Sequence, residues 1–197
     1  MNWNKKDLLS CFKMPGGSAI TGRTTTIRNV FVSAIIPVVQ PTSDEIAKVL
    51  EILELDPLSL KCSYCGDRAS EWDHLRPLVK AGRPTGYFSS IQNLVPSCGK
   101  CNQSKGSSDW RVWMLGPARQ SPSVRKIEDL AERIARLERL EAWAGCVPLK
   151  VDELVTPELL HQYYSIQDEI LNKMREAQEI AKKIGREIKA RTDSNPL

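Results

Sequence analysis

The N-terminal part of the sequence changes from loop-forming residues to apolar positions at regular spacing. Gly, Thr and basic residues come first and predict loops, and a short strand is expected near residues 29–36, ending at Pro37. A helical pattern follows, for which Ser43 is the expected N-cap and the Asp56-Pro57 pair the expected end. Its apolar positions, three or four residues apart, are Ile46, Val49, Leu50 and Leu53. One strand and one amphipathic helix are therefore predicted before the centre of the chain.

Two longer helical patterns occupy the C-terminal part of the chain. The first starts after Pro122 and ends at Gly145, and the second starts at Thr156-Pro157, a cap and first-turn pair. The apolar positions of the first are Ile127, Leu130, Ile134 and Leu137. The second has a longer stripe at helical spacing, which runs through Leu160, Tyr163, Gln167, Ile170, Met174, Ala177, Ala181, Ile184 and Ile188. Two such helices predict a helical hairpin or a dimer interface. The basic last turns of the second suit the helix dipole as a solvated face, with contact to phosphates as the alternative.

Composition narrows the class of protein. Of the 197 residues, 41% are hydrophobic and 26% are charged, values typical of a folded soluble protein. The net charge of +4 fits a nucleic-acid partner without requiring one. No apolar run reaches the roughly 18 residues of a membrane span, and residues 1–13 lack the apolar stretch of a signal peptide. We therefore expect a soluble, cytoplasmic protein with no membrane partner.

Four of the six cysteines form two Cys-x-x-Cys pairs, Cys62 with Cys65 and Cys98 with Cys101. In an intracellular chain, where thiols stay reduced, this pattern favours metal binding over disulfides. Four thiolates complete a closed tetrahedral Zn²⁺ shell, which leaves no position for water or substrate. The sequence therefore predicts a structural zinc ion that stabilises folding.

The segment between the two cysteine pairs is longer than the roughly 15 to 20 residues of a simple zinc ribbon. It contains Asp73-His74, and the second pair is followed by Asn102, Lys105 and Gly106. Clear periodicity is lost from about residue 61 to 106, as expected where a metal ion holds short elements together. Chemistry is therefore expected in this central segment.

The order of these motifs resembles a known family. An Asp-His pair lies between two Cys-x-x-Cys pairs, Asn-Leu-Val-Pro follows at 93–96, and the second cysteine pair continues as Cys-Asn-x-x-Lys-Gly. This is similar to the cysteine-stapled form of the HNH, or ββα-metal, endonucleases, over roughly residues 61–106. The resemblance implies a β-hairpin and a helix that enclose one catalytic cation.

The resemblance also implies a role for each motif residue. His74, at the end of the first strand, takes the role of general base, and Asp73 and Asn102 become ligands of the cation. Asn93 is expected to brace the loop between the strands. Asn102 stands where many members of the family carry histidine, a difference that bears on metal preference.

Elementary chemistry supports these roles. Phosphodiester hydrolysis needs a deprotonated water and neutralisation of charge at the phosphate, which an imidazole and a divalent cation can supply. The carboxylate of Asp73 and the amide of Asn102 offer hard oxygen ligands that suit Mg²⁺ or Mn²⁺. Because Asp73 and His74 are adjacent on a strand, their side chains would face opposite sides, so these roles require a bend or local twist.

Each assignment has an alternative. Asp73 could instead orient an imidazole, and Asn102 could cap the helix after the second cysteine pair. Contact with DNA phosphates and solvated surface charge are equal alternatives for four basic residues, Lys105, Arg76, Lys80 and Arg83. Packing is favoured over DNA contact for Trp110, Arg111 and Trp113. Two cysteines outside the pairs, Cys11 and Cys146, are interpreted as small buried side chains. His161 is expected to be structural or exposed.

Three functions remain open at this point. The first is a sequence-specific DNA endonuclease, a type II restriction enzyme that acts as a homodimer and breaks both strands of double-stranded DNA. The second keeps the same chemistry in a homing, phage or nicking HNH nuclease. The third is a zinc-stabilised module that binds DNA or protein without catalysis, with Asp73, His74 and Asn102 incidental.

The predicted fold class is α+β. An N-terminal strand and helix segment (1–57) precedes a small zinc-bound ββα-metal core (58–116), and a long C-terminal helical hairpin (117–197) follows. An HNH core contacts mostly the sugar-phosphate backbone of DNA, which carries little sequence information. We therefore expect the outer segments to contribute further DNA contacts or dimerisation.

Overall fold

The structure is a computed structural model that describes residues 4–6, 10 and 17–194. The interpretation of Cys11 as a buried side chain lies outside these residues. Contacts divide the chain into two compact units, residues 28–163 and the two ends, 1–27 with 164–197. The predicted zinc-bound core lies within the first of these units.

The segment near residue 30 is helical, so the strand predicted at residues 29–36 is wrong. A 3-10 helix, η1 (Ile20–Arg23), leads into α2 (Thr24–Ser33). The β-branched residues here favour a strand only where a neighbouring strand pairs with them, and the nearby pairing is a single bridge at Val38. Helical spacing instead buries Val32 completely and places the Phe31 ring against Tyr163.

The first predicted amphipathic helix is α3 (Ser43–Leu53). Its N-cap is Thr42, not Ser43. The Thr42 hydroxyl accepts a hydrogen bond from the Glu45 backbone, and the Glu45 carboxylate accepts one from the Thr42 backbone. This reciprocal capping box satisfies two amide groups that would otherwise lack partners at the helix start. Val49 and Leu53 are buried, as the apolar pattern predicts.

The centre of the chain has the predicted strand-strand-helix order. Strand β1 (Glu71–His74) pairs antiparallel with β4 (Leu94–Ser97), and helix α4 (Gly99–Lys105) follows directly. Between the paired strands lie a small hairpin and a 3-10 turn, which are β2 (Val79–Lys80), β3 (Arg83–Pro84) and η2 (Ile91–Asn93). Helix α5 (Trp110–Leu115) closes the segment. Trp110 and Trp113 are buried, so both pack the core.

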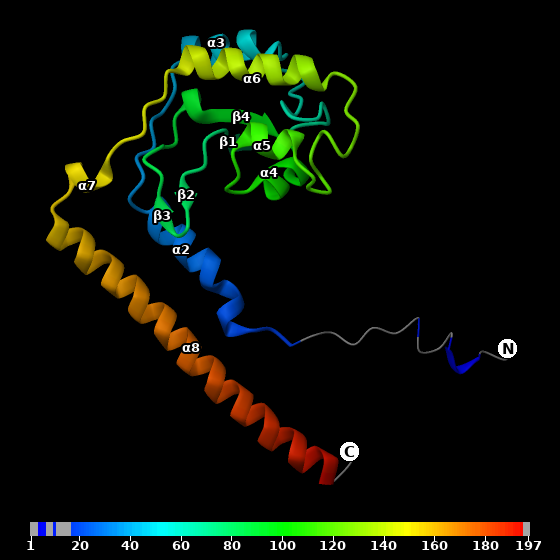
Figure 1. Cartoon of the computed structure of the whole chain (residues 1–197), viewed down its shortest axis with the longest axis vertical. Helices are drawn as coiled ribbons and strands as arrows, with labels where there is room; N and C mark the ends of the chain where they lie inside the picture. The colour runs from blue at the N-terminus through cyan, green and yellow to red at the C-terminus, as the bar shows by residue number, and fades with distance from the viewer. Residues whose placement is uncertain (1–3, 7–9, 11–16, 195–197) are drawn as a thin grey trace. The chain divides into compact units, whose positions relative to one another are not determined.

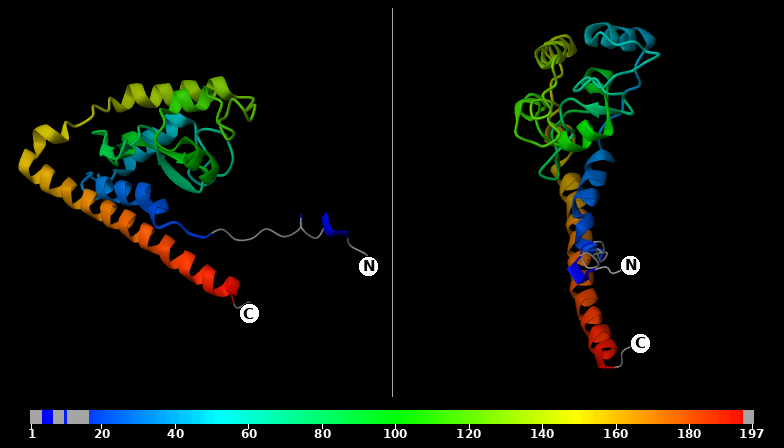
Figure 2. Two further views of the ribbon diagram at one scale, coloured as in Figure 1. Left: turned by 60° about the horizontal axis from the view of Figure 1, so that its bottom comes forward. Right: turned by 90° about the vertical axis from the view of Figure 1, so that its right-hand side faces the viewer.

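Helix α6 (Leu130–Ala144) covers this core together with α3, and Figures 1 and 2 show the two helices side by side. Its buried residues Leu137 and Leu140 join the same apolar cluster as Val49 and Leu53. The apolar face that we predicted for a hairpin or a dimer interface packs on α3 and the core. The helix ends at Gly145, which has the left-handed conformation (φ 54°) that favours glycine.

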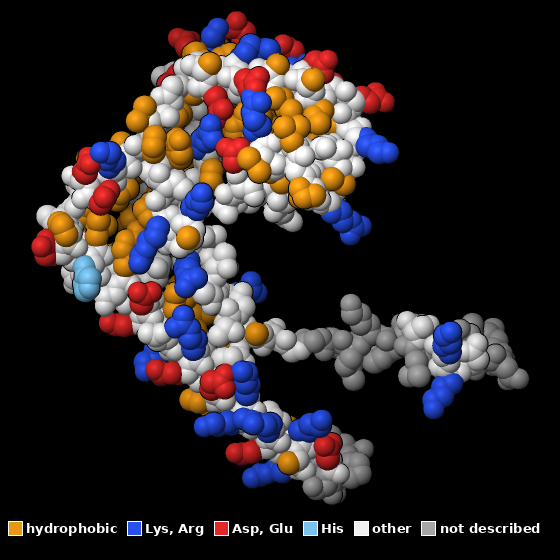
Figure 3. Space-filling view, in the orientation of Figure 1, with side chains coloured by type: hydrophobic (Ala, Val, Ile, Leu, Met, Phe, Trp, Pro, Cys, Tyr) orange, Lys and Arg blue, Asp and Glu red, His pale blue; other side chains and the backbone are white. Residues whose placement is uncertain are grey.

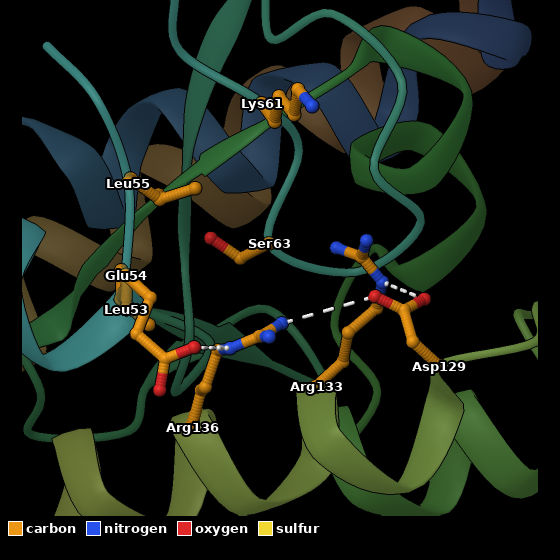
Figure 4. A pocket seen from close by; sticks show the side chains of 8 residues that line it. All are labelled: Leu53, Glu54, Leu55, Lys61, Ser63, Asp129, Arg133 and Arg136. Carbon is orange, nitrogen blue, oxygen red and sulfur yellow. Dashed lines mark hydrogen bonds and ion pairs between the residues drawn. The ribbon is translucent and has the colours of Figure 1, made fainter.

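Ion pairs and hydrogen bonds connect α6 to the C-terminal end of α3 and to the first cysteine pair. They line a pocket of about 210 Å³ that Figure 4 shows from close by. Arg136 pairs with Glu54 at 2.8 Å, and Arg133 pairs with Asp129 at 2.8 Å. Arg133 also donates a hydrogen bond of 3.1 Å to the Cys62 carbonyl. The guanidinium groups of this pocket therefore support the fold around the zinc-binding residues.

The C-terminal part of the chain consists of a short helix, α7 (Val151–Leu154), and a long one, α8 (Pro157–Ser194). Helix α8 begins at the predicted proline, whose missing N–H is not needed in the first turn. Among the described residues, no helix combines the length and apolar character that a membrane span requires.

Candidate functional site

The four paired cysteines come together as a buried cluster. Their sulfur atoms all lie within 4.8 Å of one another. The Sγ atoms of Cys65 and Cys98 are 3.7 Å apart, and a tetrahedral shell with Zn–S bonds of about 2.3 Å places sulfurs about 3.8 Å apart. The Arg125 guanidinium donates to the Cys101 sulfur at 3.6 Å and offsets part of the negative charge of the thiolates. The donor set and its spacing fit a structural Zn²⁺ ion.

Local hydrogen bonds form the two cysteine turns. In the first, the Gly66 amide donates to the Cys62 carbonyl at 2.9 Å, and Gly66 has the left-handed conformation (φ 80°) that completes the turn. In the second, Cys98 is the N-cap of α4 and Cys101 lies in its first turn. The second cysteine pair therefore lies at the start of α4, and residues 102 and 105 follow on the same helix.

Asp73 is buried between the first cysteine turn and α4. Its Oδ2 atom accepts a hydrogen bond of 2.7 Å from the Tyr64 hydroxyl and lies 3.1 Å from Lys105 Nζ. Burial, together with the nearby charge of Asp73, raises the pKa of Tyr64, which keeps its hydroxyl a donor. The contacts of Asp73 thus link the first cysteine turn to the C-terminal end of α4.

Lys105 is also buried, with 1% of its surface exposed. Besides Asp73, its ammonium group donates a hydrogen bond of 2.7 Å to the His74 carbonyl. Burial lowers the pKa of Lys105, and the Asp73 carboxylate opposes that shift. The suggested contact between Lys105 and DNA phosphates is contradicted, because the side chain is committed inside the core.

His74 lies at the end of β1 on the face opposite Asp73. The strand pairs with β4 residue for residue, so the two adjacent side chains alternate, and the bend that their joint role requires is absent from this pairing. His74 Nε2 is 2.8 Å from the Ser89 hydroxyl, in the loop between the strands. Burial lowers the pKa of His74, while the Asp73 charge acts in the opposite direction. A lowered pKa favours the neutral imidazole, the form that can accept a proton.

Asn102 contacts a carboxylate that sequence reasoning missed. Its Nδ2 group donates a hydrogen bond to Glu71 Oε2, and Glu71 lies two positions before Asp73 on the same strand. The strand period of two places Glu71 and Asp73 on one face, toward α4. The recorded contacts therefore join Asn102 to Glu71 and Asp73 to Lys105, and do not join the two predicted cation ligands directly.

Asn93 holds the loop that follows β1, the role that the resemblance implies. It is 2% exposed, and its Oδ1 atom accepts a hydrogen bond of 2.8 Å from the Arg76 backbone. Its Nδ2 group donates to the carbonyls of Arg76 and Phe88 at 3.0 and 3.3 Å. One buried amide thus fixes both ends of the loop.

The other three basic residues for which DNA contact was considered, Arg76, Lys80 and Arg83, differ in whether they are paired with carboxylates in the structure or exposed. Arg76 is committed to carboxylates, at 2.7 Å from Asp109 and 2.5 Å from Glu141. Lys80 and Arg83 are exposed on the β2–β3 hairpin. Of the remaining residues singled out in the sequence, His161 is exposed and Cys146 is partly buried.

Comparisons with known proteins agree with the motifs. A family model described as HNH endonuclease matches residues 62–108. Among curated proteins, the CRISPR-associated endonuclease Cas9 of Corynebacterium diphtheriae is 36% identical over 70 residues. The match covers 34% of this chain and only 6% of that protein. No solved structure matches the chain significantly. Residues 62–108, which contain the four clustered cysteines, are therefore similar to an HNH endonuclease domain, and this similarity supports a nuclease function.

Proposed function

We propose that the protein is a metal-dependent DNA endonuclease that hydrolyses phosphodiester bonds with His74 as the general base. The observation that carries this proposal is the coincidence of the family match at residues 62–108 with the four-cysteine cluster and a partly buried His74 at the end of β1. A zinc-stabilised binding module accounts for the cysteines alone. It gives no role to the Asp73-His74 pair between the cysteine pairs, which lies within the matched residues.

His74 would remove the proton from the attacking water. A neutral imidazole has one unprotonated nitrogen, and such general bases contribute roughly 10²- to 10⁴-fold to the rate. With Nε2 facing Ser89, Nδ1 is the atom assigned to the water. The hydrogen bond from Lys105 to the His74 carbonyl and the Asn93 bonds to the adjoining loop keep the imidazole in place.

Asp73 and Asn102 would hold the catalytic cation, Mg²⁺ or Mn²⁺. This role requires β1 to twist locally at Asp73 and His74 when DNA and the cation bind, because the two side chains alternate in the strand pairing. The donor set fits, because Asn102 uses its Nδ2 group for Glu71 and keeps an amide oxygen for a hard cation. Glu71 adds a second carboxylate beside that amide. When bound, the cation supplies charge stabilisation at the phosphate.

We further propose a type II restriction enzyme that acts as a homodimer on double-stranded DNA in the cytoplasm. An HNH core contacts mostly backbone, so segments outside residues 62–108 would supply recognition of bases. Lys80 and Arg83 are exposed on the β2–β3 hairpin, where their positive charges would bind DNA phosphates. A homing, phage or nicking nuclease is the second candidate, because the curated relative is itself an endonuclease of another kind.

Purified protein incubated with unmethylated phage DNA tests this function. Wild type and His74→Ala are compared in Mg²⁺, in Mn²⁺ and in EDTA, with His161→Ala as the matched control because His161 is exposed on α8. Discrete fragments that require both the cation and His74 are expected. A smear would indicate cleavage without sequence recognition. Single-strand nicks without double-strand breaks would indicate the nicking form of the second candidate, and uncut DNA in every condition would refute the nuclease.

A further inference from the structure

Helix α8 carries an exposed apolar stripe that the described part of the chain leaves uncovered. Four isoleucines on it, Ile166, Ile170, Ile184 and Ile188, are 46%, 38%, 53% and 58% exposed. Ala177, also exposed, lies midway between them. At about 100° per residue, these five positions fall within about 40° of the helix circumference. We call them the isoleucine stripe.

The other side of α8 already has a packing role. Leu171 and Gln167 are 3% and 2% exposed, and Gln178 accepts a hydrogen bond of 2.7 Å from the Ile20 backbone. The N-terminal residues of the same unit therefore use a different face of the helix. An apolar face of this length in water favours association with another surface.

The spacing of the isoleucine stripe is symmetric. Its intervals are four, seven, seven and four residues, so the pattern reads identically in both directions along the helix. An antiparallel copy of α8 with its two-fold axis at Ala177 places Ile166 opposite Ile188, and Ile170 opposite Ile184. The small side chain of Ala177 at the axis lets the two backbones approach closely. A two-fold contact of this kind is self-complementary, as a symmetric dimer requires.

The charges of α8 favour the same orientation. Residues 157–176 carry four acidic and two basic side chains, whereas residues 177–194 carry three acidic and five basic ones. Figure 3 shows Lys and Arg side chains gathered along the C-terminal part of the helix. An antiparallel pair brings the acidic half of one helix against the basic half of the other, with Glu169 near Lys183 of the second copy. A parallel pair would oppose like charges.

We propose that the isoleucine stripe of α8 binds the same stripe of a second copy of this chain in an antiparallel pair. The contact uses no residue of the HNH domain, so its failure and the failure of the nuclease proposal are distinguishable. His74→Ala is expected to remain dimeric.

Light scattering and sedimentation of the full chain test the proposal. Wild type is expected to be a dimer at micromolar concentration, and Ile170→Glu is expected to weaken dimerisation about 100-fold or more, because a buried charge is introduced twice. Asn172→Glu adds the same charge to an exposed position off the stripe and should stay dimeric. A monomeric wild type, or a dimer that tolerates Ile170→Glu, overturns the proposal.

Cysteine crosslinking tests the orientation independently of any loss of folding in Ile170→Glu. Ile166→Cys and Ile188→Cys are made separately in a chain that carries Cys11→Ser and Cys146→Ser. When the two are mixed and oxidised, disulfide-linked dimers should form between them, and neither variant should crosslink with itself. Self-crosslinking of Ile166→Cys would indicate a parallel pair and overturn the antiparallel one. Without any crosslink in the mixture, the stripe would serve a different partner.

Discussion

Lys105 and Asp73 form an ion pair of 3.1 Å in which both side chains are almost completely buried. The same ammonium group donates to the His74 carbonyl, so one helix residue holds both members of the Asp-His pair. Lys105 is three positions beyond Asn102 on α4, and the zinc-binding turn fixes the start of that helix. The cysteine cluster is thereby coupled to the position of His74, the proposed general base.

Removal of this ammonium group should destabilise the domain strongly. We expect Lys105→Met to lower the free energy of unfolding by about 3–5 kcal/mol, because it leaves the Asp73 carboxylate buried without a cation. Adding Asp73→Asn should restore part of the loss. Denaturant titration of the zinc-loaded protein measures both, with Lys100→Met, exposed on the same helix, as the control. Equal stability of Lys105→Met and Lys100→Met would contradict a buried ion pair.

Zinc should be required for the fold of the HNH domain. We expect one zinc ion per chain and loss of the domain's cooperative unfolding transition in Cys62→Ser, because structural zinc contributes about 10–16 kcal/mol in small zinc domains. Elemental analysis and circular dichroism measure the two effects. Cys146→Ser is the matched control, since Cys146 lies outside the cluster. Full zinc content and an unchanged transition in Cys62→Ser would contradict the four-cysteine assignment.

The pH dependence should reflect the lowered pKa of His74. Burial disfavours the charged imidazole and lowers the pKa of His74 below 6.5, the ordinary histidine value. The loss of activity on acidification should therefore have its midpoint below pH 6.5. Because the folded pKa is lower than the unfolded one, the unfolded state binds more protons between them. The contribution of neutral His74 to the free energy of unfolding is therefore fully present above the unfolded pKa. It decreases as the pH falls from the unfolded pKa to the folded pKa. The chain has two histidines, so NMR titration of His161→Asn follows His74 alone. A His74 pKa above 6.5 would contradict the burial effect.

The clustering of the four cysteines and the loop contacts of Asn93 agree with the sequence analysis, because their spacing is local or typical of a family. Three other features depend on tertiary contacts that spacing does not specify. Residues 29–33 of the strand predicted at 29–36 are helical, because helical spacing buries Val32 and the described residues give this segment no neighbouring strand beyond a single bridge at Val38. Lys105 was assigned to the surface because lysines are rarely buried without a partner, and its partner Asp73 is identified only by the packing of α4 on β1. For α6 the sequence left a hairpin and a dimer interface open, because an apolar face does not reveal what covers it, and in the structure this face packs on α3 and the core.

The contact between Asn102 and Glu71 also depends on that packing, and it predicts a positioning role for Glu71. Its carboxylate accepts the hydrogen bond from Asn102 Nδ2, which orients the amide oxygen away toward the proposed cation. Partners that orient ligands in this way typically contribute about 10- to 100-fold to metal affinity. We therefore expect Glu71→Ala to weaken Mn²⁺ binding by about that factor, measured by electron paramagnetic resonance at constant zinc content. Glu51→Ala, an exposed glutamate on α3, should bind Mn²⁺ as the wild type does. If Glu71→Ala also binds Mn²⁺ normally while Asn102→Ala does not, the amide is held by other contacts and Glu71 has no part in the site.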